Sequence, residues 1–311
     1  MKRTVVVILA ITGLALGVTS DVAFAAHKKK SVAAKRHVNV KLRKAHYVAA
    51  ETAPVDGRHL AVQSASALVQ DQTTGEILYA KKADAVVPIA SISKLMTAMV
   101  ALDAQPSLTD ELTIGDDDVD TLKGTHSRLR VGTRLSREEM LNLALMSSEN
   151  RAAAALSRHY PGGRDAFVAA MNAKSKALGL TDTRFYDPTG LTASNVSSAR
   201  DLAKMVAAAH EYPLIREFTT TAEREFVING RALTFRNTNS LVRGRSSTWD
   251  IGLSKTGYIN EAGKCLVMQA NVNNKPTIIV LLDSWGRQTR IGDANRIRKW
   301  IESNASRRSA G

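Results

Sequence analysis

The chain has few aromatic residues and a single cysteine. Phe, Trp and Tyr make up 5% of its 311 residues, so aliphatic side chains must build most of the core. Cys265 cannot form an internal disulfide, and the apolar run around it predicts a buried, unreactive thiol. No spacing of Cys and His resembles a metal site and no internal repeat is found, so we expect neither a bound metal nor a repeat fold.

No apolar run is long enough to cross a bilayer. The longest, Val5–Val18, has about 14 residues, whereas a spanning helix needs roughly 20. Lys2 and Arg3 precede this run, and Ala23-Phe24-Ala25 follows it with small residues at the positions that signal peptidase reads. We therefore predict export to the periplasm with cleavage after Ala25, and disfavour the alternative of an uncleaved membrane anchor.

Positive charge is concentrated near the N-terminus. The net charge is +14, and residues 26–58 hold nine Lys or Arg against two acidic residues, with no sustained apolar period. This composition predicts a disordered basic arm. An exported chain rarely meets nucleic acid, so anionic wall polymers or a membrane surface are the expected partners of the arm. The predicted organisation is a signal peptide over 1–25, the arm over 26–58 and a folded catalytic domain over 59–311.

Within the folded part, strand patterns lie at both ends and helical patterns lie between them. We expect folded structure to begin near Ser64, and the arrangement indicates one sheet built from distant segments with a helical insertion. The expected elements are a hairpin over 67–79 with Gly75 in its turn, helices over 92–102, 136–160, 164–180 and from Ser198 to before Pro213, a hairpin around Asn229-Gly230, strands over 251–259, 264–272 and 277–283, and a helix over 289–301.

Three short motifs carry side chains suited to acyl transfer. Ser91 and Lys94 lie three residues apart at the start of a buried helical pattern, so the amine can reach the hydroxyl. Ser148 and Asn150 stand where one helical pattern ends and another begins, although helix capping alone explains this pair equally well. Lys255-Thr256-Gly257 falls on a predicted strand, where glycine lets an extended peptide approach closely. Each motif by itself is weak.

In this order the three motifs resemble the signature of penicillin-binding proteins and class A β-lactamases. Four segments are similar to the D-alanyl-D-alanine carboxypeptidase family, most of all to its short DD-endopeptidase members: Pro88–Ala98, Ala144–Ala154, Asp187–Leu191 and Arg236–Asn239. The likeness covers roughly Ser64–Glu302, and the basic arm departs from the family pattern. The resemblance implies an α+β fold with an antiparallel sheet flanked by helices and an all-helical insertion, and it implies no cofactor.

The resemblance also implies a serine peptidase acting on peptidoglycan, with β-lactam antibiotics as covalent inhibitors. Ser91 would form an acyl-enzyme, with Lys94 as its base and Ser148 relaying a proton to the leaving amine. The expected substrate-binding residues are Asn150, Lys255, Thr256, Gly257 and Tyr258, although Asn150 could instead steady Lys94. The backbone N–H groups of Ser91 and Tyr258 would form the oxyanion hole. Lys94 can act as a base only with a lowered pKa, which we expect from burial and from Lys255 as a second cation.

Several alternatives stay open at this point. Endopeptidases and carboxypeptidases cleave after the same D-alanyl group, and the sequence favours the endopeptidase because only 54 residues follow Gly257. A β-lactamase would need a water-activating pair; Glu225 and Asn229 have the spacing but fall on a hairpin too near Lys255 in the chain. A non-catalytic wall-binding protein is disfavoured because all six motif side chains are present.

Overall fold

The computed structural model describes residues 60–244 and 249–308. These residues belong to the unit Ala53–Gly311. The predicted signal peptide (1–25) and basic arm (26–58) lie outside the described residues, and both stay predictions. Among the residues that are described, no helix has the length and apolar character needed to cross a membrane.

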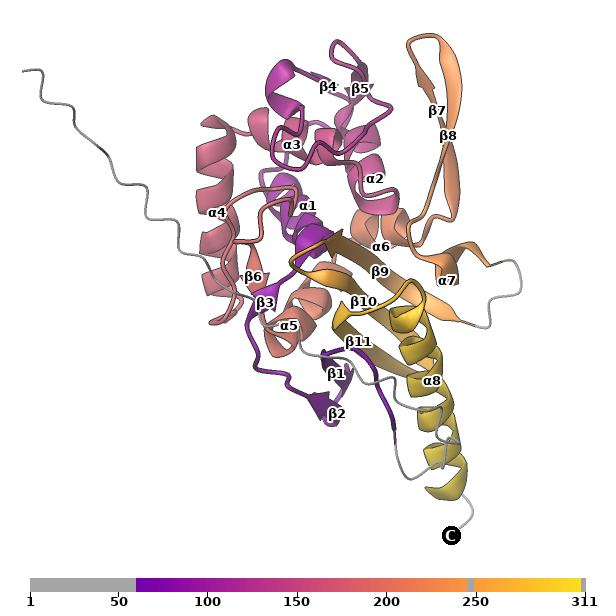
Figure 1. Ribbon diagram of the computed structural model, residues 1–311. Helices are drawn as coiled ribbons and strands as arrows, with labels where there is room; N and C mark the ends of the chain where they lie inside the picture. Colours follow the sequence, from indigo (N-terminus) through magenta and orange to yellow (C-terminus); the bar gives the residue numbers. More distant parts are fainter. Residues whose placement is uncertain (1–59, 245–248, 309–311) are drawn as a thin grey trace, which may run out of the picture. The chain divides into compact units, whose positions relative to one another are not determined.

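A five-stranded antiparallel sheet forms the centre of this unit (Figure 1). Its strand order is β2-β1-β11-β10-β9, so the first strand pairs with the last. The strands are β1 (Ser66–Asp71), β2 (Ile77–Lys81), β9 (Asp250–Ile259), β10 (Gly263–Val272) and β11 (Lys275–Ser284). This topology confirms the expectation of one sheet assembled from distant segments.

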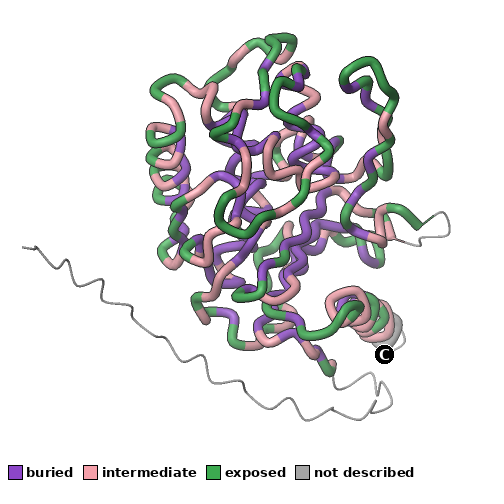
Figure 2. Tube along the Cα trace, turned by 45° about the horizontal axis from the view of Figure 1, so that its top comes forward, coloured by how far each residue is buried: buried purple, intermediate pink, exposed green. Residues whose placement is uncertain are grey.

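Both faces of the sheet are covered. In β1 the side chain of Leu68 enters the larger core beneath the helices, whereas Ala67 and Val69 enter a smaller core beneath α8 (Thr289–Arg308). This alternation follows from the two-residue period of a strand. Figure 2 shows the buried residues running through the interior, with exposed residues on the outer turns. Helix α8 begins at the predicted residue and ends later than the predicted Ile301.

The helical region surrounds one buried helix. Helix α1 (Lys94–Asp103) is buried from Lys94 to Ala101, as its all-round apolar pattern predicts. The predicted helix over 136–160 is in fact two helices, because Ser148 has a left-handed φ of +62° that no helix can continue. The surrounding helices are α2 (Arg137–Met146), α3 (Asn150–Arg158), α4 (Gly163–Ala177), α5 (Ala199–His210) and α6 (Pro213–Thr220).

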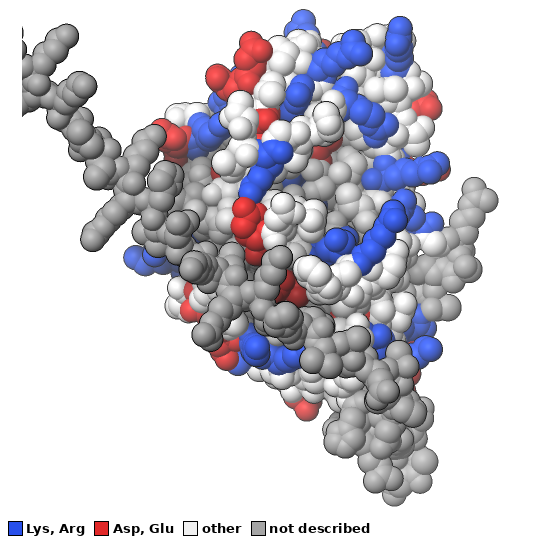
Figure 3. Space-filling view, viewed as in Figure 1, with Lys and Arg blue, Asp and Glu red and all other residues white. Residues whose placement is uncertain are grey.

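A separate hairpin projects beside the helices. Strands β7 (Glu223–Ile228) and β8 (Arg231–Arg236) pair only with each other, and Asn229 and Gly230 adopt the positive φ angles that a two-residue turn requires. The hairpin prediction is therefore confirmed. Figure 3 shows Lys and Arg side chains gathered over the upper part of this face, around the hairpin and the helical region beside it.

Some short elements were not predicted. Two small antiparallel pairs are formed by β3 (Val87–Pro88) with β6 (Val196–Ser197), and by β4 (Glu111–Thr113) with β5 (Arg134–Ser136). Helix α6 begins at Pro213, where we expected only the end of the preceding helix. Proline is well accommodated in a first helical turn, since its missing N–H has no partner there. Helix α7 (Ser240–Arg243) follows β8.

Candidate active site

Ser91 lies in a tight 3-10 turn, Ala90–Ser93, directly before α1. Ala90 has a φ of +49°, which turns the chain sharply at this point. Two glycines pack against the turn: a Cβ added to Gly190 would lie 2.0 Å from the Ala90 carbonyl oxygen, and one added to Gly257 would lie 2.8 Å from that of Ile89. The turn is therefore held between the 187–192 loop and β9.

Lys94 is fully buried, and its amine donates three hydrogen bonds. Its Nζ lies 2.9 Å from Ser91 Oγ, 2.7 Å from Asn150 Oδ1 and 2.7 Å from the Thr189 carbonyl oxygen. The expected reach from Lys94 to Ser91 is thus present, and Asn150 steadies the lysine. Burial lowers the pKa of Lys94 to about 7, although the negative charges of Asp187 and Glu149 oppose the shift.

Lys255 is a second buried lysine in the same cleft. Its Nζ donates to Ser148 Oγ at 2.9 Å and to the Thr256 carbonyl oxygen at 3.2 Å. Burial lowers the pKa of Lys255 well below its ordinary value, and repulsion by Lys94 lowers it further. The sequence argument made Lys255 a cause of the shift at Lys94; in the structure burial suffices for Lys94, and the repulsion between the lysines acts on Lys255.

Strand β9 is an edge of the sheet and carries the third motif. The Thr256 hydroxyl donates to Thr238 Oγ1 at 2.7 Å, which joins β9 to the segment after β8. A Cβ on Gly257 would lie 3.2 Å from the Ser91 amide nitrogen, so the strand passes directly beside the turn that carries Ser91. The exposed Tyr258 side chain donates to Asn260 instead of pointing to Ser91, so only its backbone is a candidate for the site.

Sequence reasoning gave no role to the 187–192 loop. Asp187 accepts hydrogen bonds from the backbone N–H groups of Thr189, Gly190 and Thr192. Thr97 of α1 donates to the Pro188 carbonyl oxygen, which fastens the loop to the helix. These bonds fix the Thr189 carbonyl that accepts from Lys94. Every residue has a backbone carbonyl, so the sequence does not reveal which carbonyl accepts a bond from a side chain. Only the similarity of Asp187–Leu191 to the family pointed to this loop.

A second segment that sequence reasoning missed is the loop over 120–125. Asp120 accepts from the backbone of Leu122, Lys123 and Thr125. The amide of Asn150 donates to Thr125 Oγ1 at 3.0 Å. On the far side, Lys123 forms an ion pair of 2.5 Å with Glu261 in the turn after β9. The loop thus connects the Asn150 side of the cleft to the β9 side.

Arg290, in the first turn of α8, is the third feature that was not predicted. Its Nε and Nη1 are buried and have no hydrogen-bond partner among the described residues, and burial lowers its pKa. Its charge also lowers the pKa of Lys255, so the two cations lie within electrostatic reach of each other. Unpaired buried donors of this kind suit an anionic ligand.

Cys265 is buried, as expected, and burial raises its thiol pKa to about 11. Glu225 lies exposed on β7 and Asn229 lies in the turn of the same hairpin, outside the central sheet. The structure therefore offers no support for reading this pair as a β-lactamase water site. Among the residues that the structure describes, no group of three or more His, Cys, Asp or Glu side chains is placed to hold a metal ion.

Comparison with known proteins decides the family. Residues 48–286 match the D-alanyl-D-alanine carboxypeptidase family of peptidases. The chain belongs to this family. D-alanyl-D-alanine endopeptidases from Pseudomonas aeruginosa and Escherichia coli are similar to it: the first is 51% identical over 242 residues, covering 77% of each chain, and the second is 50% identical over 244 residues, covering 78% of each. The crystal structure of the Streptomyces K15 DD-transpeptidase superimposes with a TM-score of 0.71 at 28% identity, covering 77% of this chain and 97% of that chain.

In this member of the D-alanyl-D-alanine carboxypeptidase family, the three motifs meet at one cleft. Each of the two serines, Ser91 and Ser148, receives a hydrogen bond from a different buried lysine. Such a pair of hydroxyl–amine contacts can move a proton to or from each oxygen. The fold that the sequence predicted, an antiparallel sheet with flanking helices, is that of the family's DD-peptidases.

Proposed function

We propose that the chain hydrolyses D-alanyl amide bonds in peptidoglycan stem peptides through an acyl-enzyme on Ser91. The observation that carries this proposal is the buried Lys94 amine, 2.9 Å from Ser91 Oγ and with its pKa lowered to about 7. At neutral pH a large share of this amine is unprotonated, whereas a lysine with a pKa of about 10.4 is neutral only about once in 2,500 molecules. The lysine can therefore accept the proton of the attacking hydroxyl.

In the first step Ser91 Oγ attacks the D-alanyl carbonyl carbon while Lys94 Nζ takes the hydroxyl proton. The negative charge then develops on the carbonyl oxygen. The backbone N–H groups of Ser91 and Tyr258 are the proposed donors to it, as the family resemblance implies. The close packing of Gly257 against the Ser91 amide supports this assignment, since it brings β9 beside the nucleophile.

The leaving amine must gain a proton before the C–N bond breaks. Ser148 is the proposed donor, because its hydroxyl is hydrogen-bonded to Lys255, which can replace the proton that Ser148 gives up. Water then attacks the acyl carbon and releases Ser91. For this step Lys94 must first release to solvent the proton that it took from Ser91, while Lys255 regains the proton that it supplied. The free Lys94 amine is then the proposed base that takes a proton from the attacking water and returns it to Ser91 Oγ as the acyl bond breaks.

Carboxylate recognition is assigned to Lys255, Thr256 and Arg290. D-alanyl-D-alanine and a D-alanyl cross-link to the D-centre of diaminopimelate both carry a carboxylate on the carbon next to the scissile nitrogen. The buried Lys255 amine, the Thr256 hydroxyl and the unpaired Nε and Nη1 donors of Arg290 suit this group. The same cations suit the carboxylate of penicillins, which would acylate Ser91 and leave slowly.

We further propose that cross-linked dimers are the preferred substrate. The relatives at about half identity carry the endopeptidase name, whereas the family is described as carboxypeptidases. A cross-link offers a second stem peptide whose contacts raise the rate when they strengthen in the transition state. The predicted signal peptide supports a periplasmic location, where such dimers are found, and the basic arm is proposed to contact the anionic wall or membrane surface.

The deciding experiment compares kcat/KM for a D-alanyl-diaminopimelate cross-linked dimer with that for a monomeric pentapeptide at equal salt. A tenfold preference for the dimer needs about 1.4 kcal/mol of differential transition-state binding. Equal or reversed values would make the protein a carboxypeptidase first and would leave the Ser91 assignment intact. Absence of turnover with both peptides would refute the peptidase assignment itself.

A further inference from the structure

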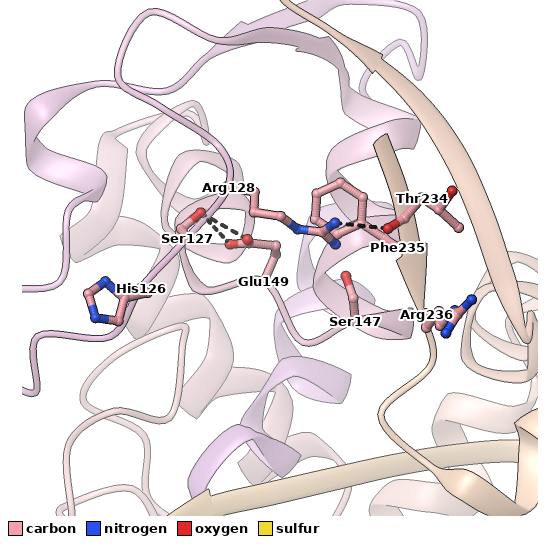
Figure 4. Close-up of a pocket in the computed structure, with 8 residues that line it drawn as sticks. All are labelled: His126, Ser127, Arg128, Ser147, Glu149, Thr234, Phe235 and Arg236. Carbon is pink, nitrogen blue, oxygen red and sulfur yellow. Dashed lines mark hydrogen bonds between the residues drawn. The ribbon is translucent and has the colours of Figure 1, made fainter. Parts of the chain in front are cut away.

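A pocket of about 630 Å³ adjoins the cleft and has no part in the steps above (Figure 4). One wall is the segment 126–128 of the connection between β4 and β5, the second is Ser147 and Glu149, and the third is the segment 234–236 of β8. Two of these walls continue into the cleft. Ser147 and Glu149 flank Ser148, and β8 leads within two residues to Thr238, whose hydroxyl bonds Thr256.

The walls are held together at their outer ends. The Arg128 guanidinium lies 3.5 Å over the ring of Phe235 and donates to the Thr234 carbonyl oxygen at 2.9 Å. The backbone N–H of Thr238 donates to the Met146 carbonyl oxygen at 3.0 Å. These bonds connect the hairpin both to the segment between β4 and β5 and to the end of α2. The pocket is thus bounded by fixed segments and opens beside the reacting residues.

The pocket is positively charged. Arg128 and Arg236 line it together with His126, and Glu149 is its one acidic residue. The Glu149 carboxylate already accepts from the Ser127 hydroxyl, with both oxygens within 2.9 Å. Among the described residues, the guanidinium of Arg236 is engaged only through Nε, at 3.0 Å from the exposed Glu223. Exposed ion pairs of this kind contribute little, so Arg236 can exchange this partner for a ligand carboxylate at small cost.

We propose that this pocket binds a free carboxylate carried by the peptide part of the substrate, away from the scissile bond. The inference rests on the proposed function and adds a specificity determinant to it. Stem peptides carry a free carboxylate where a D-glutamate is linked through its side chain, and in some cell walls that group is an amide. A cationic pocket distinguishes the two forms, because the amide has no charge to pair with Arg236 and Arg128.

The test uses two pentapeptides that end in D-alanyl-D-alanine and differ only in a free or an amidated α-carboxyl on the glutamyl residue. The wild-type protein should favour the free acid about tenfold in kcat/KM, mainly through KM. Arg236→Gln should lose this preference, and Arg236→Lys should keep part of it. Arg231→Gln is the matched control, since Arg231 is exposed on the same strand, carries the same charge and does not line the pocket.

A binding measurement separates this proposal from the proposed function. The Ser91→Ala variant should bind the free acid about tenfold more tightly than the amide by calorimetry, and the double variant with Arg236→Gln should bind both equally. This outcome would support the pocket even if the wild-type protein turned over neither peptide. Equal binding of the two peptides by Ser91→Ala, or an equal loss with Arg236→Gln and Arg231→Gln, would overturn the proposal.

Discussion

Lys255 donates to Ser148, with 2.9 Å between Nζ and Oγ, and this bond joins β9 to the turn between α2 and α3. Lys255 is thus hydrogen-bonded to Ser148, whereas Lys94 is hydrogen-bonded to Ser91. The two amines are buried in one cleft, and the charge of Lys94 is one cause of the lowered pKa of Lys255, so the protonation of one lysine affects that of the other. In the proposed mechanism, the base and the group that resupplies the proton donor are therefore both lysines, and they differ in their neighbours.

The rate at which penicillin acylates Ser91 should depend on pH through Lys94. Because burial lowers the Lys94 pKa to about 7, the amine is protonated and inactive below that pH and is a free base above it. We expect the second-order acylation constant to rise through a midpoint near pH 7 and to be about a hundredfold lower at pH 5 than at its plateau. Stopped-flow measurements from pH 5 to 9 check this, and a rate that still rises without a midpoint up to pH 9 would contradict the lowered pKa of the base.

Labelled penicillin should attach to Ser91 alone. Ser91→Ala should abolish labelling, while Ser93→Ala should retain it, because the buried Ser93 hydroxyl is bonded to the Ala90 carbonyl oxygen and to Asn195. Mass spectrometry of the modified peptide identifies the residue. A label on Ser93 or Ser148 would show that the nucleophile has been assigned wrongly.

Gly190→Ala should be far more damaging than Gly132→Ala. Both glycines have a left-handed φ, +80° and +85°, but a Cβ at Gly190 would lie 2.0 Å from the Ala90 carbonyl oxygen, whereas nothing lies within 4 Å of one at Gly132. We expect the control to lose about 1 kcal/mol of stability and Gly190→Ala to lose about 3 kcal/mol. Urea unfolding and the penicillin acylation rate measure the two effects. Similar losses in both variants would mean that the turn carrying Ser91 can shift to accommodate the added Cβ.

Deleting residues 26–58 should weaken binding to isolated sacculi at low salt. The arm carries nine cations, and screening should reduce its contribution as salt rises. Hydrolysis of a small soluble substrate should stay nearly unchanged, and pelleting assays at two salt concentrations compare the proteins. A tenfold fall in turnover with the fold intact would place the arm in the site.

The sequence was informative wherever a function depends on local spacing. Ser91 and Lys94 meet because three residues are one helical turn apart, and the Asn229-Gly230 turn forms because both residues tolerate positive φ. The bonds from Lys94 to Asn150 and to the Thr189 carbonyl join segments far apart in the chain, so local periodicity could not place them.

Arg290 escaped notice for a related reason. It lies in the first turn of a helix that carries several other arginines, and only the packing of α8 shows that its Nε and Nη1 are buried without a partner among the described residues. The motif around Ser148 was placed between two helical patterns, but the helix was still predicted as one segment over 136–160, because the left-handed backbone of Ser148 was not visible in the sequence. Serine is common at helix ends, so its presence there does not reveal which backbone conformation it takes.

The antiparallel pairing of β1 with β11 also determines when the protein can acquire its structure. Ser64 and Ser284 are hydrogen-bonded although 220 residues separate them, and Ser66 faces Leu282 across the two strands. A nascent chain therefore cannot close its central sheet until nearly all of its length has been made, and such non-local pairing is slow to form. We expect a chain ending before Lys275 to be digested readily by protease. We predict that the protein is exported, and for a chain that crosses the membrane unfolded this delay would postpone formation of the central sheet until the last strand has crossed.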